Sequence, residues 1–334
     1  MNMHATALAH PNIAFIKFWG LADEPRRIPA NGSLSMNIDG LTTRTRVEFD
    51  PTLAADELLI NGQPVFGNGL TRVQTFMDRI RKLAEKTLYA HITSENNFPI
   101  GAGLASSASG FAALALAGTA ALGLTLSERE LSALARFGSG SACRSIPAGF
   151  VEWTVDPATS ETDAHSIAPV DHWDLVDCIA ILSHAHKPVG SQEGMRSAPS
   201  SPLQAARVAD AERRLKLCRQ AILERDFAVL AEITELDCNL MHAVMMTSTP
   251  PLYYWEPGSL AIIQAVKAWQ AEGLSVTFTL DAGPNVHLIT TRGSMDEVTH
   301  RLRRFPEVID VVCGGPAGPA RLVEQVSPSR TAQV

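Results

Sequence analysis

Residues 98–109, FPIGAGLASSAS, run directly into the Ala-rich apolar segment 111–124. Gly101 and Gly103 permit a positive φ, and the small residues around them let the backbone close on a ligand. A helix that begins here offers unpaired N–H groups and the positive end of its dipole, which together favour an anion. Additional hydroxyl ligands for phosphate or Mg²⁺ come from Ser106, Ser107 and Ser109. The pattern indicates a phosphate-binding loop, and the alternative is a flexible turn before a capped core helix.

The overall composition is that of a globular protein with an acidic surface. The chain has 334 residues, of which 46% are hydrophobic and 19% are charged, and its formal net charge is −7. A chain of this length can bury a large core, as one large domain or two fused ones. The charge argues against a diffuse basic surface for nucleic acid or anionic lipid, so neither partner is expected. An anionic substrate must therefore be bound by a few cations gathered in one cleft.

The apolar segment and the cysteines indicate where the protein works. Segment 111–124 is shorter than the roughly 20 residues that a membrane span needs, so it predicts a buried helix. The first residues, MNMHATALAHPN, do not have the pattern of a signal peptide. The cysteines are scattered without CxxC spacing, at Cys143, Cys178, Cys218, Cys238 and Cys313. These features predict reduced thiols and a cytoplasmic location.

Local patterns predict strands and helices in the first half of the chain. Residues 45–49 alternate, which predicts a strand with Thr45, Val47 and Phe49 on one face. Residues 58–60 followed by Asn61-Gly62 predict a hairpin with a type I′ turn. Segment 70–88 has helical spacing, and Ser127 with Glu130 forms a capping box that begins another helix. The apolar face of segment 70–88 is predicted to contain Val73, Phe76, Met77, Ile80 and Leu83.

The second half repeats this mixture of elements after a polar segment. Residues 191–202, SQEGMRSAPSSP, are predicted to form a loop between two halves of the chain. Helices are expected at 205–225, 226–245 and 259–270, and strands at 274–280 and 308–313. The class is therefore α+β or α/β. We expect two domains, 1–187 and 188–334.

Two charged residues stand out because of their apolar neighbours. Lys17 lies in the apolar run 13–19, where a strand-end lysine with its amine in water is the ordinary interpretation. Asp281 follows a predicted strand and precedes a Gly-Pro turn, where an Asx turn is ordinary. The functional alternative is that the ammonium of Lys17 pairs with Asp281 and keeps it ionised. Arg144 lies among glycines and serines, and its guanidinium matches a carboxylate in two-point contact.

Several segments, distributed from end to end, resemble one family. The loop, within NNFPIGAGLASSASGFAALALA, resembles the ATP loop of the GHMP kinase superfamily, and specifically that of the mevalonate diphosphate/phosphomevalonate decarboxylase family. The resemblance covers roughly residues 5–325. Its other motifs are HPNIAFIKFWG (10–20), IPANGSLS (28–35), GSGSACRS (138–145), DCNLMHA (237–243) and DAGPN (281–285).

The resemblance implies a fold, an activity and its cofactors. The fold is the α+β GHMP kinase fold, with an N-terminal half like ribosomal S5 domain 2 and a C-terminal ferredoxin-like half around a deep cleft. The activity is ATP-dependent decarboxylation of a 5-phosphorylated mevalonate in isoprenoid biosynthesis, with ATP and Mg²⁺ as cofactors. Members of the family are commonly homodimers, so a homodimer is expected.

The resemblance also assigns site residues by position. Asp281 is the base for the C3 hydroxyl, Lys17 is its partner, and Arg144 binds the substrate carboxylate. The other expected substrate contacts are Asn12, Ala14, Phe18, Leu21, Ser139, Gly140, Ser141, Ser191, Gln192, Met195 and Ala282. Of these, the resemblance implies that Ser139, Gly140 and Ser141 contact the 5-phosphoryl group. The expected nucleotide contacts are Ser94, Asn97, Pro99, Gly101, Ala102, Gly103, Leu104, Ala105, Ser106, Ser107 and Ser109, with Ser107 as the candidate Mg²⁺ ligand.

Three departures from the family pattern concern the substrate. Leu21 stands where diphosphate-specific members usually carry Lys, Gln192 where bacterial members often carry Arg, and Phe18 where Tyr is usual. Hydrogen bonds to charged groups are worth roughly 1.5–3 kcal/mol, so these losses should weaken diphosphate binding, with Arg196 as a partial replacement. We therefore expect mevalonate 5-phosphate as the preferred substrate, giving isopentenyl phosphate. The alternatives are mevalonate 5-diphosphate or dual use.

Two rival functions remain on this fold. One is a simple kinase, such as a mevalonate 3-kinase, which would release a stable phosphorylated product without CO₂. The other is a sensor that binds ATP without turnover. The presence of both Lys17 and Asp281 favours decarboxylation over either.

Overall fold

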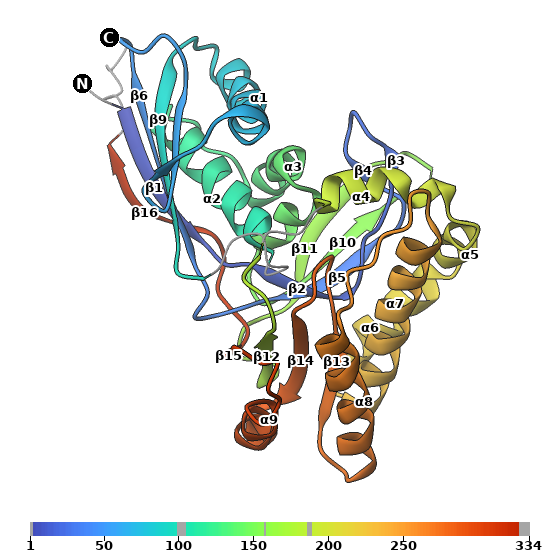
Figure 1. Cartoon of the computed structure of the whole chain (residues 1–334). Coiled ribbons are helices and arrows are strands. Elements are labelled where there is room, and N and C mark those ends of the chain that lie inside the picture. The colour runs from blue at the N-terminus through green and yellow to red at the C-terminus, as the bar shows by residue number, and fades with distance from the viewer. Residues whose placement is uncertain (1–2, 99–104, 157, 186–188, 327–334) are drawn as a thin grey trace.

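The computed structural model describes residues 3–98, 105–156, 158–185 and 189–326. Within them the chain forms three sheets of four to six strands, a small two-stranded sheet, and helices packed on them. In Figure 1 the sheet that contains both ends of the described chain lies at the top, and the sheet with β12 and β14 lies at the bottom. Strands and helices are thus both present in each half, as the α+β prediction requires.

The first sheet joins the two ends of the chain. Its order is β16-β1-β6-β9-β7-β8, and β16 pairs antiparallel with β1, matching His4 with Val326. Helix α2 (Ser106–Ala121) lies against β1 and β6, and α1 (Gly67–Ala84) packs on α2. The strand bounds are β1 (Met3–Ala9), β6 (Thr43–Asp50), β7 (Glu57–Ile60), β8 (Gln63–Pro64), β9 (Tyr89–Asn96) and β16 (Arg321–Val326).

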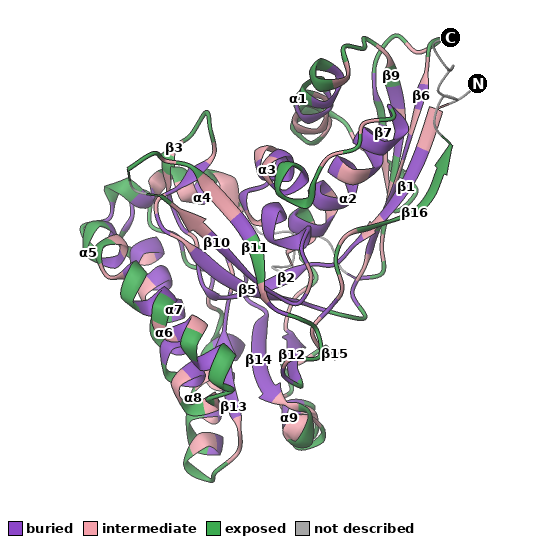
Figure 2. Cartoon of the chain, turned by 180° about the vertical axis from the view of Figure 1, so that it is seen from behind, coloured by how far each residue is buried: buried purple, intermediate pink, exposed green. Residues whose placement is uncertain are grey.

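The second sheet lies at the centre of the molecule. Its order is β11-β10-β5-β2, and the small sheet β3-β4 follows β2 along the chain. The bounds are β2 (Asn12–Ile16), β3 (Leu21–Asp23), β4 (Ile28–Pro29), β5 (Ser33–Asn37), β10 (Phe150–Val155) and β11 (Thr162–Ala168). Helix α3 (Glu128–Gly138) and the 3₁₀ helix η1 (Gly140–Ser145) lie beside it. Figure 2 shows β2, β5 and β10 buried along most of their length.

The third sheet has the order β13-β14-β12-β15, and all of its pairings are antiparallel. Along the chain its strands and the helices between them follow the β-α-β-β-α-β order of a ferredoxin-like unit. The strand bounds are β12 (Leu175–Ile181), β13 (Val276–Thr279), β14 (Val286–Thr291) and β15 (Asp310–Gly314). The helix bounds are α4 (Ser191–Ser197), η2 (Ala198–Ser200), α5 (Gln204–Ala209), α6 (Ala211–Glu224), α7 (Phe227–Thr247), α8 (Pro257–Ala271), η3 (Arg292–Ser294) and α9 (Met295–Leu302).

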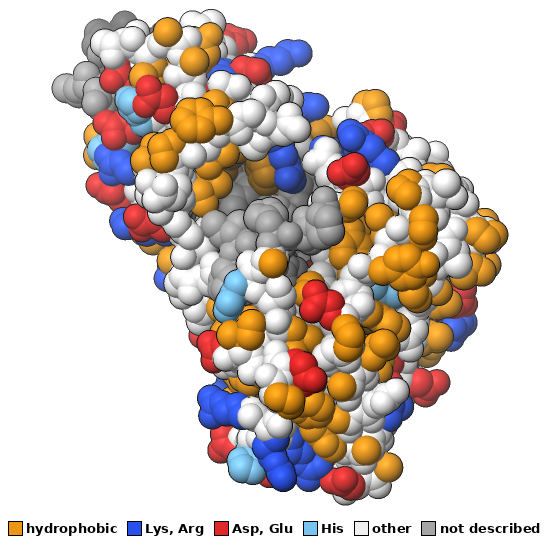
Figure 3. All heavy atoms as spheres, in the orientation of Figure 1, with side chains coloured by type: hydrophobic (Ala, Val, Ile, Leu, Met, Phe, Trp, Pro, Cys, Tyr) orange, Lys and Arg blue, Asp and Glu red, His pale blue; other side chains and the backbone are white. Residues whose placement is uncertain are grey.

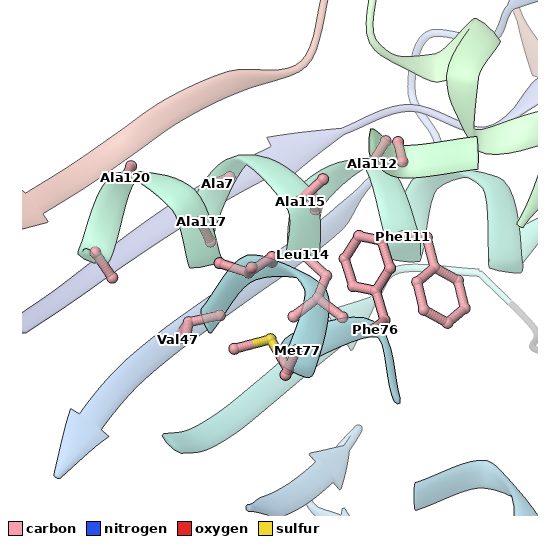
Figure 4. Close-up of a cluster of buried hydrophobic side chains, with 14 of the residues drawn as sticks. Ala7, Val47, Phe76, Met77, Phe111, Ala112, Leu114, Ala115, Ala117 and Ala120 are labelled. Carbon is pink, nitrogen blue, oxygen red and sulfur yellow. The ribbon is translucent and has the colours of Figure 1, made fainter. Parts of the chain in front are cut away.

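Helix α2 is buried because it is apolar on nearly all sides. Its alanines allow it to approach β1 and β6 closely, and Figure 4 shows Ala115 and Ala117 in the same buried cluster as Ala7 and Val47. Phe76 of α1 meets Phe111 of α2 edge-on, with ring centroids 5.2 Å apart. A helix that is apolar all round belongs in a core. The core therefore fixes the position of the helix start that carries the serines.

Several local predictions are confirmed. Asn61 and Gly62 both have positive φ, 48° and 74°, as a type I′ hairpin requires. The capping box of Ser127 and Glu130 is present at the start of α3. Thr45, Val47 and Phe49 are buried on one face of β6.

Two local predictions are wrong. Leu83 does not belong to the buried face of α1, because 54% of its surface is exposed near the end of the helix. Segment 191–202 is not a loop throughout, because α4 and η2 occupy most of it. Gly194 allows α4 to approach Trp19, since a Cβ built there would lie 3.1 Å from the indole ring. Contacts distant in sequence thus stabilise a helix that the polar composition did not suggest.

Strand pairing does not follow the expected boundary between residues 187 and 188. β12 precedes that boundary but pairs with β14 and β15, which follow it. β16 lies far beyond the boundary but pairs with β1. The chain therefore crosses between the two parts, and the division at residue 187 stays a prediction of the sequence.

Candidate active site

A cavity of about 480 Å³ opens between the N-terminal sheet with its helices and the segments around α4 and α7. Figure 3 shows this face of the molecule hollowed near its middle. The polar lining residues come from distant parts of the chain and are Lys17, Arg27, Thr45, Arg72, Ser94, Asn96, Ser106, Ser107, Ser139, Ser141, Arg144, Ser191, Gln192 and Asp281. A cavity of this size suits a small-molecule site.

One end of the cavity has the features of a phosphate site. Ala105, directly before α2, has a φ of 51°, a left-handed conformation that costs a non-Gly residue roughly 1–2 kcal/mol. Ser106 and Ser107 follow it at the cavity wall, and Ser107 Oγ lies 3.2 Å from Ser139 Oγ. The expected contacts Pro99, Gly101, Ala102, Gly103 and Leu104 lie outside the described residues.

Apolar side chains line the adjoining part of the cavity beside a few polar groups. This patch consists of Leu58, Ile60, Val65, Val73, Ile92, Phe111 and Leu114. Ser94 lies next to it, as expected, and so does Asn96, which the sequence analysis missed. The alternation of β9 could have revealed Asn96, because residues 92, 94 and 96 share one face. The residues present fit a nucleotide, with its base on the apolar patch and its phosphates at the start of α2.

Two expected nucleotide contacts require correction. Ser109 is completely buried, and its Oγ lies 2.6 Å from Thr43 Oγ1 in the core, so it does not line the cavity. Asn97 is exposed, and its side chain accepts from Thr42 N at 2.8 Å and donates to Gly40 O at 2.7 Å. Ser109 faces the core side of α2, and Asn97 lies just beyond the end of β9, whose last residue is Asn96.

Lys17 and Asp281 meet in the cavity. The Nζ atom of Lys17 lies 2.7 Å from Asp281 Oδ1, so the expected pairing of the two side chains is present. The side chain of Lys17 is 2% exposed, whereas that of Asp281 is 30% exposed and faces the cavity. The ordinary interpretation of Lys17, an amine extended into water, is therefore wrong. A buried ammonium beside a carboxylate stabilises the ionised carboxylate.

The backbone of Lys17 is held by a buried network that the sequence analysis missed. Lys17 N donates to Asp237 Oδ2 at 2.6 Å, and Lys17 O accepts from Arg207 at 2.7 Å and from Asn31 at 2.9 Å. Arg214 donates to the other oxygen of Asp237 at 2.8 Å. All of these side chains are buried. The motif containing Asp237 was noticed in the sequence, but its contact with Lys17 was not apparent.

Arg144 is buried in the 3₁₀ helix η1, so its Gly/Ser segment is not a surface turn with a solvated arginine. Its guanidinium donates to Ser35 Oγ at 2.9 Å, Ser33 Oγ at 2.6 Å and Asn12 Oδ1 at 3.1 Å, and it reaches the cavity wall. Burial lowers the pKa of Arg144. Asn12 was expected to contact the substrate, but it is buried outside the lining and orients Arg144. Asn12 also donates to Ser145 Oγ at 2.8 Å.

The structure brings most of the remaining expected substrate contacts together. The residues that line the cavity as expected are Ala14, Phe18, Ser139, Gly140, Ser141, Ser191, Gln192, Met195 and Ala282. Gly140 has to be small, because a Cβ there would lie 2.7 Å from Phe18 Cζ. Leu21 requires correction, because it pairs with Pro29 in the β3-β4 hairpin and does not line the cavity. Arg27 and Arg72 line it instead, and neither belongs to a motif that indicated a site residue.

Comparison with known proteins agrees with this geometry. Residues 9–168 match the diphosphomevalonate decarboxylase-like N-terminal domain, and residues 178–317 match the mevalonate 5-diphosphate decarboxylase C-terminal domain. The diphosphomevalonate decarboxylase of Candida albicans is 37% identical over 312 residues, which cover 88% of this chain and 86% of that protein.

Solved structures agree as well. A mevalonate diphosphate decarboxylase from Enterococcus faecalis superposes with a TM-score of 0.88 at 35% identity, covering 97% of this chain and 100% of that one. A complex of MDDEF with MVAPP, AMPPCP and magnesium has a TM-score of 0.90 at 36% identity, with the same coverage.

The fold and the cavity define an enzyme of the GHMP type. The chain belongs to the diphosphomevalonate decarboxylase family. The sequence predicted this family, an ATP-dependent decarboxylase activity, and ATP and Mg²⁺ as cofactors. The relatives confirm these predictions at the level of the family. None of the helices in the described part of the chain combines the length and apolar character that a bilayer crossing needs.

Proposed function

We propose that this protein decarboxylates mevalonate 5-diphosphate at the expense of ATP, giving isopentenyl diphosphate, CO₂, ADP and phosphate. The observation that carries the proposal is the Lys17–Asp281 pair, 2.7 Å apart in the same cavity as the serine-bearing start of α2. The names of the relatives support the diphosphate as substrate, and one complex contains MVAPP. The preference for the monophosphate that the sequence indicated is therefore replaced as the main proposal.

The first stage transfers a phosphoryl group to the substrate. Asp281 accepts the proton of the C3 hydroxyl, and Lys17 keeps the carboxylate ionised until then. The C3 oxygen attacks the γ-phosphorus of ATP, the bond to the β–γ bridging oxygen breaks, and ADP leaves. Positioning and electrostatics supply most of the catalysis in such transfers. The 3.2 Å contact between Ser107 and Ser139 supports this step, because it joins the nucleotide end of the cavity to the substrate end.

The second stage forms the alkene. The C3–O bond breaks and phosphate leaves with its electron pair, so positive charge develops on C3. The bond between the carboxylate carbon and C2 then supplies the electrons of the new C2–C3 double bond, and CO₂ departs. We assign Arg144 to the carboxylate, because its guanidinium is fixed by Ser33, Ser35 and Asn12 at the cavity wall. A closed pocket favours loss of CO₂ over capture of the cation by water.

Magnesium fits the polar end of the cavity. When bound, it neutralises charge on the nucleotide phosphates. The hydroxyls available to hold it include Ser107, which is exposed to the cavity beside Ser106. Among the described residues there is no cluster of three or more His, Cys, Asp or Glu side chains for a metal. The hydroxyl-rich wall is thus the part of the described cavity that we assign to the magnesium nucleotide.

Mevalonate 5-phosphate is the second candidate substrate, because two of the three departures from the family pattern lie in the cavity wall. Phe18 packs edge-on against Trp153, with ring centroids 5.1 Å apart, and brings no hydroxyl to the cavity. Gln192 lines the cavity without a charge. A homodimer and a cytoplasmic location stay predictions of the sequence.

Substrate competition tests the proposal. The purified protein is given magnesium, ATP and equal concentrations of the 5-phosphate and the 5-diphosphate, while both products and CO₂ are quantified. We expect CO₂ equal to ADP formed, with isopentenyl diphosphate in excess. A preference of more than about tenfold for the monophosphate, equivalent to about 1.4 kcal/mol, would establish the second candidate instead. A stable 3-phosphorylated product without CO₂ would identify a kinase and overturn both.

A further inference from the structure

We propose that Arg27, with Arg72 beside it, binds the terminal phosphoryl group of the substrate's 5-diphosphate, because both guanidinium side chains line the cavity next to Ser139–Ser141. This inference rests on the proposed function and adds a specificity-determining residue to it. Arg27 would supply a charge that Leu21 and Gln192 do not.

Arg27 is held in an unusual backbone conformation in the β3-β4 hairpin. Its φ is 55°, which costs a non-Gly residue roughly 1–2 kcal/mol. The turn is closed by Arg27 N donating to Glu24 O at 3.1 Å and by Arg26 N donating to Asp23 Oδ1 at 2.8 Å. The side chain of Arg27 lines the cavity, whereas Leu21, in the paired strand, does not. Strained positions concentrate at functional sites, where surrounding structure maintains them.

Arg72 is fixed at the other side of this region. It lies on α1, and its Nε and one terminal nitrogen donate to Gly138 O at 3.1 and 2.6 Å. Its guanidinium carbon lies 4.6 Å from the centroid of the Phe111 ring. Because Gly138 directly precedes Ser139, Arg72 is next to the serines expected to contact the 5-phosphoryl group. Arg72 therefore has a preset orientation toward the substrate end of the cavity.

The charges of Arg27 and Arg72 are not paired directly with any carboxylate of the described residues. Among the described residues, neither forms an ion pair with a carboxylate within 4.0 Å. Burial, and then the repulsion of Arg27, lower the pKa of Arg72 to about 10. Burial likewise lowers the pKa of Arg27, with Glu24 opposing the shift and Arg196 and Arg79 adding to it. Partly desolvated like charges at a cavity wall are stabilised when an anion binds between them.

Arg196 does not supply the missing charge, although the sequence made it a candidate. Its Nε lies 2.6 Å from Glu24 Oε1, both side chains are about half exposed, and Arg196 does not line the cavity. The charge of Arg196 is therefore largely compensated at the surface. That ion pair also joins α4 to the turn that carries Arg27, so the turn is held over the cavity.

The substrate is a better occupant than the nucleotide for geometric reasons. Arg72 is anchored on Gly138 and thus on the segment 139–141, while the nucleotide phosphates are assigned to the start of α2. A second phosphoryl group on the substrate extends beyond Ser139–Ser141 and needs additional cations. Among the described residues, Arg27 and Arg72 are the lining cations available for it, because Lys17 is engaged by Asp281 and Arg144 is assigned to the substrate carboxylate.

The test compares Arg27→Gln with the matched control Arg26→Gln, whose exposed side chain lies next to it outside the cavity. For Arg27→Gln we expect the KM for mevalonate 5-diphosphate to rise about 10–100-fold, as the loss of a charged hydrogen bond implies. The KM values for mevalonate 5-phosphate and for ATP should change less than about threefold, because neither ligand carries the terminal phosphoryl group that Arg27 binds. Arg27→Lys should recover part of the loss, and Arg26→Gln should match the unmodified protein.

Binding of inorganic pyrophosphate, measured by calorimetry on the same proteins, separates this inference from the proposed function. Weaker pyrophosphate binding in Arg27→Gln alone supports the inference even if no substrate is decarboxylated. An unchanged KM for the diphosphate together with unchanged pyrophosphate binding overturns it. A raised KM for ATP, with the diphosphate unaffected, also overturns it and assigns the charge to the nucleotide. Absence of CO₂ release from the unmodified protein defeats the proposed function only.

Discussion

The backbone amide of Lys17 donates to the carboxylate of Asp237 at 2.6 Å, although 220 residues separate them. Asp237 lies on α7 and is completely buried together with Arg214, which contacts its other oxygen. The ammonium of Lys17 therefore faces Asp281 from a backbone that is fixed by a different element of the fold. We infer that Asp237 is a positioning residue for the reaction.

Asp237→Asn should lower both stability and turnover. The asparagine has one oxygen in place of the two that accept from Lys17 N and from Arg214. Its amide nitrogen, itself a donor, would face one of these two donors. Removing one partner of a buried ion pair costs about 3–5 kcal/mol of unfolding free energy. We also expect the acidic limb of the kcat/KM profile to move to higher pH, because the ammonium that favours ionised Asp281 is displaced. Urea unfolding and a pH–rate profile measure the two effects.

Asp210→Asn is the matched control for that variant. Asp210 also contacts Arg214, at 2.8 Å, but it is partly exposed and does not touch Lys17. Its loss should change the unfolding free energy by no more than about 1 kcal/mol, with the pH profile unchanged. If both variants show the same pH profile as the unmodified protein, Asp237 has a structural role alone.

Asp281→Asn should abolish most of the activity while leaving the fold intact. The amide oxygen can still accept from Lys17, but it cannot take the proton of the C3 hydroxyl. General base catalysis contributes about 10²–10⁴-fold, so kcat should fall by that factor with ATP affinity little changed. Single-turnover CO₂ release and nucleotide titration provide the measurement. Near-normal turnover in this variant is the result that the proposed mechanism could not survive.

His242 should make the protein sensitive to mild acid. Burial lowers the pKa of His242 to about 3, and the charge of Lys17 adds to the shift. A folded-state pKa below the unfolded value of about 6.5 means that the unfolded chain binds the proton first, so stability falls as the pH drops below 6.5. Between pH 7 and pH 5 this residue alone should cost about 2 kcal/mol of unfolding free energy. Urea titrations at the two pH values measure this loss of unfolding free energy. The His242→Gln variant should lose about 2 kcal/mol less than the unmodified protein, and equal losses in the two proteins would contradict the role given to His242.

Gly138→Ala should be destabilising for a local steric reason. The added Cβ would lie 2.0 Å from Phe111 Cδ1, and that ring is confined by Phe76. Overpacking of this kind typically costs about 1–3 kcal/mol, and displacement of Gly138 O would also disturb Arg72. Gly110→Ala is the comparison, because a Cβ there meets nothing within 4 Å and alanine favours a helix. Thermal unfolding should therefore separate the two variants in opposite directions, and equal melting temperatures would refute the steric account.

The parts of the fold that follow local rules could be predicted from the sequence. The Asn61-Gly62 turn, the capping box at Ser127 and the alternation of β6 each depend on neighbouring residues, and each prediction is confirmed. Helix α4 was missed because it depends on packing against Trp19 and Leu252, which are distant in sequence. Composition within the segment carries no signal of such contacts.

The candidate site likewise contains residues that could be predicted from the sequence and residues that could not. The resemblance placed Lys17 and Asp281 together, and they are 2.7 Å apart. The resemblance could not distinguish residues whose side chains point into the cavity from neighbours whose side chains point elsewhere. Ser109 and Asn97 were therefore assigned wrongly as nucleotide contacts. Arg27 was missed because its role depends on a left-handed backbone in a hairpin whose orientation only the fold determines. Motifs thus identified the chemistry, and the structure was needed for the direction of each side chain.

The pairing of β16 with β1 has a consequence for how the protein is made. Leu8 pairs with Arg321 across the two strands, so strands more than 300 residues apart in the sequence lie side by side in one sheet. Contacts between residues so far apart form slowly, because the intervening chain must lose its freedom first. On the ribosome, the edge of the N-terminal sheet at β1 must therefore stay unpaired until β16 has been synthesised.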